Sequence, residues 1–194
     1  MQTTVYLLRH AEYESPEHSI PGRLPGFPLS AAGREKAGEL AVYFQKKPIV
    51  AVYASPLLRT RQTGEIIAKA TGIPCSPDDR LLEVRSGIGG QKEGFIENEL
   101  GGWLYTSKWH KDRRGEMPQE IFDRMADFMR KKVAQHAGEE LIVVSHGDPI
   151  MFLIAGYQGL PFHSREVQKL DYIQMGQYIT LLFDSLTAPP HLIR

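Results

Sequence analysis

The sequence predicts an α/β protein in which helices cover both faces of a mostly parallel sheet, forming a three-layer α/β/α sandwich. The first observation is a set of short runs rich in β-branched, aromatic and aliphatic residues, each about the length of one buried strand. These runs occur at 4–8, 50–54, 141–144 and 179–183. The second observation is that segments with helical periodicity lie between them. Strands that alternate with helices form parallel sheets with both faces covered.

The composition is that of one ordinary globular domain. At 194 residues the chain can bury a substantial core, so we expect a single domain over residues 1–194. Lys plus Arg and Asp plus Glu both number 23, which argues against bulk attraction to nucleic acid or to an anionic membrane. No window approaches the roughly 20 apolar residues of a membrane span. With one cysteine, Cys75, there is no internal disulfide, and we expect a cytoplasmic protein whose oligomeric state is open.

The N-terminal half shows clear boundary signals for two helices. Residues 14–29 are rich in Pro and Gly and are expected to form a loop. Ser30 then stands where an N-cap would precede the first helix. For the second helix we expect Ser55 as the N-cap with Pro56 in the first turn. That helix is expected to end near Gly72.

The C-terminal half begins with an irregular segment. Residues 86–115 contain seven glycines, and we expect them to form a lid or specificity insertion. A long helix is predicted from about Pro118 to His136. After the strand at 141–144, Gly147 is expected to end the extended chain before another helix begins. The last ten residues are predicted to be a tail.

Chemically useful side chains follow three of the predicted strands. Arg9 and His10 follow the first, the segment Ser55 to Arg59 follows the second, and His146 lies just after the third. In open α/β sheets, ligands bind beyond the carboxyl ends of the strands. Two arginines and two histidines are therefore expected to meet at one edge of the sheet.

These residue types suit the transfer of a phosphoryl group. Arg9 and Arg59 offer the planar, fixed donors that bind phosphate oxygens, and Arg59 falls in the first turn of a helix, where free N–H groups also favour anions. A neutral imidazole such as His10 can act as a nucleophile and form a covalent intermediate. The leaving oxygen then needs a proton. Glu83 can supply it if burial among apolar neighbours raises its pKa.

Five sequence blocks resemble signature segments of the histidine phosphatase superfamily, the group that contains phosphoglycerate mutases and many acid phosphatases. They occur in the family's order and span about three quarters of the chain. The blocks are LLRHAE at 7–12, PLSAAGREKA at 28–37, SPLLRTRQT at 55–63, LLEVRSGIGGQKEG at 81–94 and VVSHGDPI at 143–150.

The resemblance implies a role for each matching residue. His10 would be the phosphorylated nucleophile, and Glu83 would be the proton donor. Arg9, Arg59 and His146 would hold the phosphoryl oxygens. The resemblance also implies a phosphoglycerate mutase-like sandwich fold and a chemistry that needs no metal and no other cofactor.

The chain departs from the family pattern at two places that can be checked in a structure. Ala11 replaces the usual glycine after the nucleophile, so a left-handed backbone is not expected there. Met117 replaces a serine that would cap the following helix, although Pro118 partly compensates. The remaining histidines lack the spacing of metal ligands, so no metal site is predicted. They are His18, His110, His136, His163 and His191.

Three functions remain open at this level. The leading one is a phosphatase that hydrolyses small phosphomonoesters; a short stretch between the glutamate and S-H-G blocks favours it over a phosphoglycerate mutase. The third is a regulatory protein that removes phosphate from protein histidines or other phosphoproteins. The predicted site residues all touch the phosphoryl group, which every substrate shares, so they do not identify the leaving group. Trp103, Tyr105 and Trp109 form an aromatic cluster that either packs locally or makes a wall over the leaving group.

Overall fold

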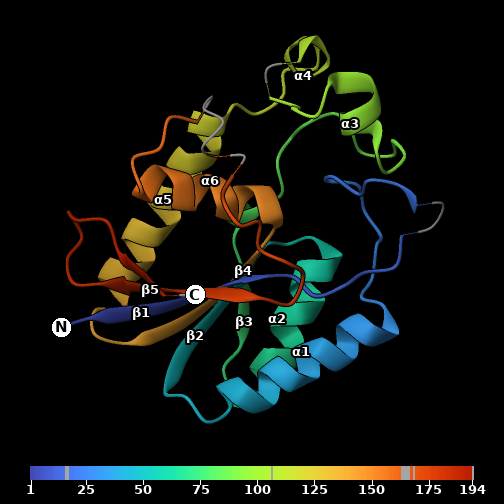
Figure 1. Ribbon diagram of the computed structural model, residues 1–194. Coiled ribbons are helices and arrows are strands. Elements are labelled where there is room, and N and C mark those ends of the chain that lie inside the picture. The colour runs from blue at the N-terminus through green and yellow to red at the C-terminus, as the bar shows by residue number, and fades with distance from the viewer. Residues whose placement is uncertain (16–17, 106, 163–166, 168, 194) are drawn as a thin grey trace.

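The computed structural model describes residues 1–15, 18–105, 107–162, 167 and 169–193, and it confirms the α/β sandwich (Figure 1). Within this part of the chain, six strands form one sheet in the order β3-β2-β4-β1-β5-β6. The strands are β1 (Thr3–Arg9), β2 (Ile49–Ala54), β3 (Cys75–Pro77), β4 (Glu140–Ser145), β5 (Tyr178–Phe183) and β6 (His191–Ile193).

The sheet is mostly parallel, as predicted. Strand β4 lies between β1 and β2 and is parallel to both, and β3 extends the parallel part at the far edge. Strand β5 pairs with β1 in the antiparallel sense, and β6 pairs with β5. The prediction of a tail over the last ten residues is wrong at His191–Ile193, which forms β6. Both β3 and β6 have only three residues at an edge, which leaves little apolar periodicity to detect.

Two pairs of helices cover the two faces (Figure 1). One pair packs with the side chains of Tyr6 and Leu8 of β1, and the other packs with those of Val5 and Leu7, because successive side chains of a strand point to opposite faces. The first pair is α1 (Ala31–Phe44) and α2 (Leu58–Thr71), and the second pair is α5 (Pro118–Gln135) and α6 (Gly147–Tyr157).

The central strand β4 anchors both layers of the core. Its residues Leu141 to Val144 are fully buried, with side chains alternating between the two apolar clusters. Burying one such side chain stabilises the fold by about 1.5–3 kcal/mol. The rigid sheet core therefore ends directly at Ser145 and His146.

The helix ends confirm most of the boundary signals. The Ser30 hydroxyl accepts a hydrogen bond from the Gly33 N–H and caps α1, and Gly72 ends α2 with a left-handed backbone, φ +75°. At α5, the Glu120 carboxylate accepts the Met117 N–H at 2.7 Å, so the helix start is closed without a side-chain cap from Met117. Pro118 occupies the first turn.

The prediction that Ser55 is the N-cap of α2, with Pro56 in its first turn, is wrong, and both residues precede the helix. The helix begins at Leu58, and Leu57 is its N-cap without a side-chain hydrogen bond. The Ser55 hydroxyl lies 2.9 Å from Nε2 of His146 instead, while its interaction with the Leu57 N–H is long at 3.4 Å. Ser55 is thus used by a site residue rather than by the helix.

Residues 86–115 are less irregular than predicted. The segment contains two short helices, α3 (Phe95–Leu100) and α4 (Lys108–Asp112), which lie together at one end of the molecule (Figure 1). A short 3₁₀ helix, η2 (Asp79–Leu81), precedes the segment. Ile88 and Leu104 pack with Phe152 of α6 in a separate apolar cluster. Among the helices of the described residues, none combines the length and apolar character needed to cross a bilayer.

The loop after β1 is held tightly against the start of α1. A Cβ atom on Gly33 would lie 1.9 Å from the carbonyl oxygen of Glu12, which also accepts the Ser30 N–H at 3.1 Å. A residue with a side chain would push the loop and the helix apart. Since this loop follows directly on His10, Gly33 helps to fix the position of His10.

We predict that Gly33→Ala destabilises the protein by about 1–3 kcal/mol, the usual effect of forcing an atom into a packed contact. Gly38→Ala on the same helix is the matched control, because nothing lies within 4 Å of a Cβ there. The control should stabilise the helix by about 0.5–1 kcal/mol. Urea unfolding of both variants checks the prediction, and equal free energies of unfolding would contradict it.

Candidate active site

The structure brings all five predicted site residues together beyond the carboxyl ends of the parallel strands. Arg9, His10, Arg59 and Glu83 line a cavity of about 280 Å³. His146 is fully buried behind Arg59, and its ring centroid lies 5.3 Å from that of His10. The predicted convergence at one edge of the sheet is confirmed.

Arg59 is the most deeply placed cation of the site, with 1% of the residue exposed. Its Nε donates to Nε2 of His10 at 3.3 Å. Its Nη2 lies 2.9 Å from the Gly22 carbonyl oxygen and 3.1 Å from Nδ1 of His146. Its Nη1 has no hydrogen-bond partner among the described residues. A buried N–H group without a partner is unfavourable unless a ligand accepts from it, and an anion in the cavity would do so.

The proton of the His10 ring can be placed from its neighbours. Nδ1 lies 2.8 Å from the Ala11 carbonyl oxygen, which can only accept, so Nδ1 carries the proton. Nε2 faces the Arg59 guanidinium, which can only donate, so Nε2 keeps its lone pair. Burial and then the positive charge of Arg59 hold the pKa of His10 well below its usual value. The ring is neutral, with a nucleophilic nitrogen at the cavity.

The same argument assigns the proton of His146. Its Nδ1 accepts from Nη2 of Arg59, and its Nε2 therefore donates to the Ser55 hydroxyl at 2.9 Å. Burial, followed by the charge of Arg59, lowers the pKa of His146 well below its usual value. His146 is thus also neutral, and Ser55 fixes its orientation.

Arg9 is held by its main-chain and aromatic neighbours. Its Nη1 donates to the Ile173 carbonyl oxygen at 2.8 Å, and the guanidinium lies 5.2 Å from the centre of the Tyr172 ring. Its buried Nε has no partner in the described part of the chain. Arg9 therefore also keeps a free donor for an anion.

Glu83 lines the cavity and lies beside His146. One carboxylate oxygen accepts the Val84 N–H at 2.8 Å, and the other lies 3.8 Å from Nδ1 of His146. Burial, assisted by the negative charge of Asp148, raises the pKa of Glu83 to about 7. A carboxyl group with this pKa is partly protonated at neutral pH and can act as an acid or a base.

Asp148 is a site residue that the sequence reasoning missed. It lies in the first turn of α6 and lines the cavity. Its carboxylate accepts hydrogen bonds from the hydroxyl groups of Tyr105 and Tyr172, the second at 2.7 Å. Gly147 leaves room for Tyr172, because a Cβ there would lie 2.1 Å from the tyrosine oxygen. The position directly after the S-H-G block, in the first turn of a predicted helix, was the available signal.

Two further details concern the residues around His10. Tyr13 lines the cavity, with its ring centroid 5.5 Å from that of His10, and was not anticipated. Ala11 is fully buried and is not among the residues with positive φ, as expected. Its N–H donates to the Thr63 hydroxyl at 3.1 Å.

The aromatic cluster of residues 103–109 divides between two roles. Trp109 packs on Phe95 with ring centroids 4.9 Å apart. Trp103 and Tyr105 line a second cavity of about 430 Å³ that adjoins the one at His10. Trp109 thus packs locally, and the wall over the leaving group stays a prediction for Trp103 and Tyr105.

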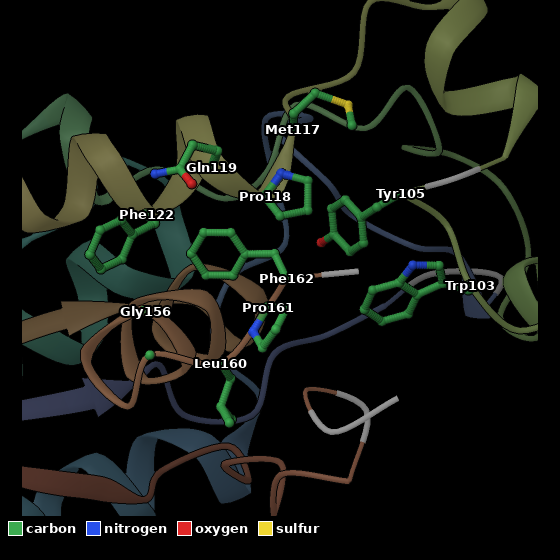
Figure 2. Close-up of a pocket in the computed structure, with 11 residues that line it drawn as sticks. Trp103, Tyr105, Met117, Pro118, Gln119, Phe122, Gly156, Leu160, Pro161 and Phe162 are labelled. Carbon is green, nitrogen blue, oxygen red and sulfur yellow. The ribbon is translucent and has the colours of Figure 1, made fainter. Parts of the chain in front are cut away.

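A third, larger cavity of about 590 Å³ lies between α5 and the end of α6 (Figure 2). It is lined mainly by apolar and aromatic side chains, including Trp103, Phe122 and Phe162. None of its described lining residues carries a charge, and none belongs to the cluster around His10. Of these three cavities, the one at His10 is lined by arginine side chains, Arg9 and Arg59.

Metal ligands do not gather around the cavity in the described part of the chain. No three side chains of His, Cys, Asp or Glu are grouped there as ligands of one ion would be. His163, one of the histidines considered above, lies outside the described residues. Metal independence stays a prediction.

The chain belongs to the histidine phosphatase superfamily. The model of branch 1 of that superfamily matches residues 5–178, which include every residue of the polar cluster described above.

Curated relatives carry two kinds of description. An uncharacterized protein of Mycobacterium tuberculosis is 34% identical over 158 residues, covering 78% of this chain and 77% of the relative. A probable phosphoglycerate mutase of Serratia proteamaculans is 31% identical over 177 residues, covering 86% and 80%.

Solved structures share the same fold. The YhfR protein of Bacillus stearothermophilus superposes with a TM-score of 0.83 at 25% identity, covering 98% of this chain and 95% of that one. A mycobacterial glucosyl-3-phosphoglycerate phosphatase gives a TM-score of 0.80 at 20% identity, covering 99% and 97%. The second likeness concerns the fold alone.

We predict that Asp148→Asn lowers the pKa of Glu83 from about 7 towards its ordinary value. The substitution removes a negative charge but keeps the size of the side chain, so less repulsion opposes ionisation of Glu83. A ¹³C NMR titration of the glutamate carboxyl groups checks this, with Glu83→Gln to assign the signal. Asp123→Asn, on the exposed side of α5, is the control and should leave the pKa unchanged. An unshifted Glu83 pKa in Asp148→Asn would contradict the assignment.

Proposed function

We propose that this protein is a phosphatase that hydrolyses small phosphomonoesters through a phosphohistidine intermediate on His10. One observation carries the proposal: Nε2 of His10 has its lone pair at a cavity that also holds a free, buried donor of Arg59. The nucleophile and an anion-binding group thus meet at one place. Membership of a superfamily of phosphatases and mutases supports the proposal.

In the first step, Nε2 of His10 attacks the phosphorus atom. The N–P bond forms as the bond from phosphorus to the ester oxygen breaks. The ester oxygen leaves with the proton of the Glu83 carboxyl group, so a neutral alcohol is released and Glu83 becomes a carboxylate. The Ala11 carbonyl keeps accepting from Nδ1–H and stabilises the positive charge that develops on the ring.

In the second step, water attacks the phosphorus atom of the phosphohistidine. The Glu83 carboxylate takes one proton from the water as the new P–O bond forms. The N–P bond breaks, and its electron pair returns to Nε2 of His10. Inorganic phosphate leaves, and both residues regain their starting protonation states, so the cycle closes without any other reactant.

The remaining cluster residues neutralise the phosphoryl oxygens. Arg59 contributes Nη1, and Arg9 contributes Nε, the two donors without partners in the described chain. His146 starts neutral because burial, and then the positive charge of Arg59, lowers its pKa well below the usual value. A bound dianion reverses the local charge and favours proton uptake at Nδ1, after which His146 can donate to a phosphoryl oxygen. In this proposal, side chains alone neutralise the charge of the phosphoryl oxygens, so no metal ion and no cofactor is needed.

Residues 86–115 serve as the specificity segment in this proposal. Ile88, Ile96, Glu97 and Leu104 of this segment line the cavity at His10, so they would face the leaving group. The proposed site of action is the cytoplasm, on small phosphorylated substrates, with no nucleic acid or membrane partner.

A phosphoglycerate mutase activity is the second candidate. The name of the Serratia relative favours it. In a mutase, a second hydroxyl group would take the place of water in the second step, and the same residues would act. Release of inorganic phosphate by the purified protein separates the two, because a mutase conserves the phosphoryl group.

We predict that His10→Ala lowers kcat for phosphomonoesters to below about 1% of wild type, because the covalent route disappears. The exposed His191 offers the matched control, and His191→Ala should keep full activity. Assays run with and without a chelator also test metal independence. A His10→Ala variant that folds and retains more than a few per cent of kcat would rule out His10 as the nucleophile.

We predict that the loss in Glu83→Gln depends on the leaving group. An alkyl phosphate leaves as a basic alkoxide and needs a proton, so its kcat/KM, which reports the first step and not the hydrolysis of the intermediate, should fall by roughly 10²–10⁴-fold. A nitrophenyl phosphate leaves as a weakly basic phenolate and should be slowed much less. For wild type, kcat/KM of alkyl substrates should fall as pH rises above about 7, where Glu83 loses its proton.

The same two substrates provide the internal control. Glu83→Gln keeps the size and polarity of the side chain, and a folding defect would appear separately as a lower Tm. Equal losses of kcat/KM on both substrates would mean that Glu83 orients the site instead of donating the proton.

A further inference from the structure

We infer that this site selects phosphomonoesters whose leaving group is uncharged or cationic and has an apolar or aromatic surface, and that it discriminates against leaving groups with a carboxylate or a second phosphate. The inference rests on the proposed function, since it concerns the part of the substrate that the phosphatase releases.

A second cavity that could hold the leaving group adjoins the cavity at His10. The cavity at His10 and the second cavity of about 430 Å³ share five lining residues. The shared residues are Ile96, Glu97, Leu104, Asp148 and Tyr172. Neither arginine lines the second cavity. A phosphomonoester held by Arg9 and Arg59 would therefore extend past the shared residues.

The charge of the lining residues changes sign along the path from the phosphate site at His10 to the second cavity. At the phosphate end, the two arginines keep donors that have no partner in the described chain, which points to an anion there. Further along, the charged residues among the described lining of the second cavity are Glu97 and Asp148, both negative. Glu93 adds a third carboxylate at the mouth of the first cavity.

The walls of the second cavity are aromatic. Tyr105 packs against Trp103 with ring centroids 5.3 Å apart and against Phe152 at 4.8 Å. Tyr172 closes the side next to Asp148. Aromatic faces next to carboxylates attract cations and flat apolar groups, whereas they offer no donor fork for an anion.

Two buried or half-buried arginines behind Glu83, Arg23 and Arg124, are engaged with other groups. Arg23 donates to the Glu83 carbonyl oxygen and to the Glu116 carboxylate at 3.1 Å, and it does not line either cavity. Arg124 also pairs with Glu116, at 2.6 Å. A glycerate carboxylate would thus meet Glu97 and Asp148 without a compensating cation from the described lining residues.

The first test measures binding to the His10→Ala variant, which cannot form the phosphoenzyme. Calorimetry with phosphocholine, phenyl phosphate and 3-phosphoglycerate compares a cationic, a neutral and an anionic leaving group. We expect 3-phosphoglycerate to bind roughly 5- to 20-fold more weakly than either of the others at low salt. The difference should shrink as ionic strength rises towards about 0.5 M. Wild-type kcat/KM values should follow the same order.

The second test reverses one charge of the path. Glu97→Lys should raise the affinity and the kcat/KM for 3-phosphoglycerate relative to phenyl phosphate by roughly tenfold. Glu99→Lys is the matched control, because Glu99 lies on the same exposed helix and changes the net charge equally but lines neither cavity. The control should leave the ratio unchanged.

The outcomes separate this inference from the proposed function. Equal or tighter binding of 3-phosphoglycerate, or the same shift in both lysine variants, would overturn the charge selection even if the protein is an efficient phosphatase. If wild type releases no phosphate from any of the three compounds but the binding order holds, the proposed hydrolysis fails and the charge selection stands.

Discussion

The buried guanidinium group of Arg59 is the constraint on which the rest of the site depends. It can only donate hydrogen bonds, so Nε2 of His10 and Nδ1 of His146 must both accept. Their protons are thereby placed on the nitrogens that face the Ala11 carbonyl and the Ser55 hydroxyl. Burial and this one fixed cation together keep both rings neutral, and Nε2 of His10, which lines the cavity, keeps its lone pair. The cost of burying this charge falls when a phosphoryl group accepts from Nη1.

The register of the parallel strands determines where Arg9, His10 and Ser55 lie relative to one another. Arg9 lies opposite Ser145 in the β1–β4 pair, and the His10 N–H donates to the Ser145 carbonyl oxygen at 3.0 Å. The Ser55 N–H donates in the same way to Val144 at 3.0 Å. The main-chain hydrogen bonding of the sheet therefore continues one residue past the end of β1 and of β2 and holds His10 and Ser55 in place. Glu83 and Asp148 complete it from outside the sheet, and their mutual repulsion adds to burial in raising the pKa of Glu83.

Features governed by strand ends could be predicted from the sequence, because a parallel sheet has one carboxyl edge and His10, Arg59 and His146 all had to lie there. Features that depend on which of several possible partners a side chain bonds could not be predicted from the sequence. Ser55 has the sequence context of a helix cap, yet its hydroxyl is used by His146, a choice that only the fold decides. Asp148 was missed because its neighbours Tyr105 and Tyr172 lie 43 and 24 residues away in the sequence.

The most direct test of this account is the position of the phosphorus atom in the intermediate. The protein would be mixed rapidly with a phosphomonoester, quenched in alkali, where phosphohistidine survives, and examined by ³¹P NMR and by peptide mapping. The account predicts phosphorus on His10, bonded to Nε2, because Nδ1 is held by the Ala11 carbonyl oxygen. Phosphorus on Nδ1 of His10 or on another residue, or phosphate release without any phosphoenzyme under single-turnover conditions, would contradict it.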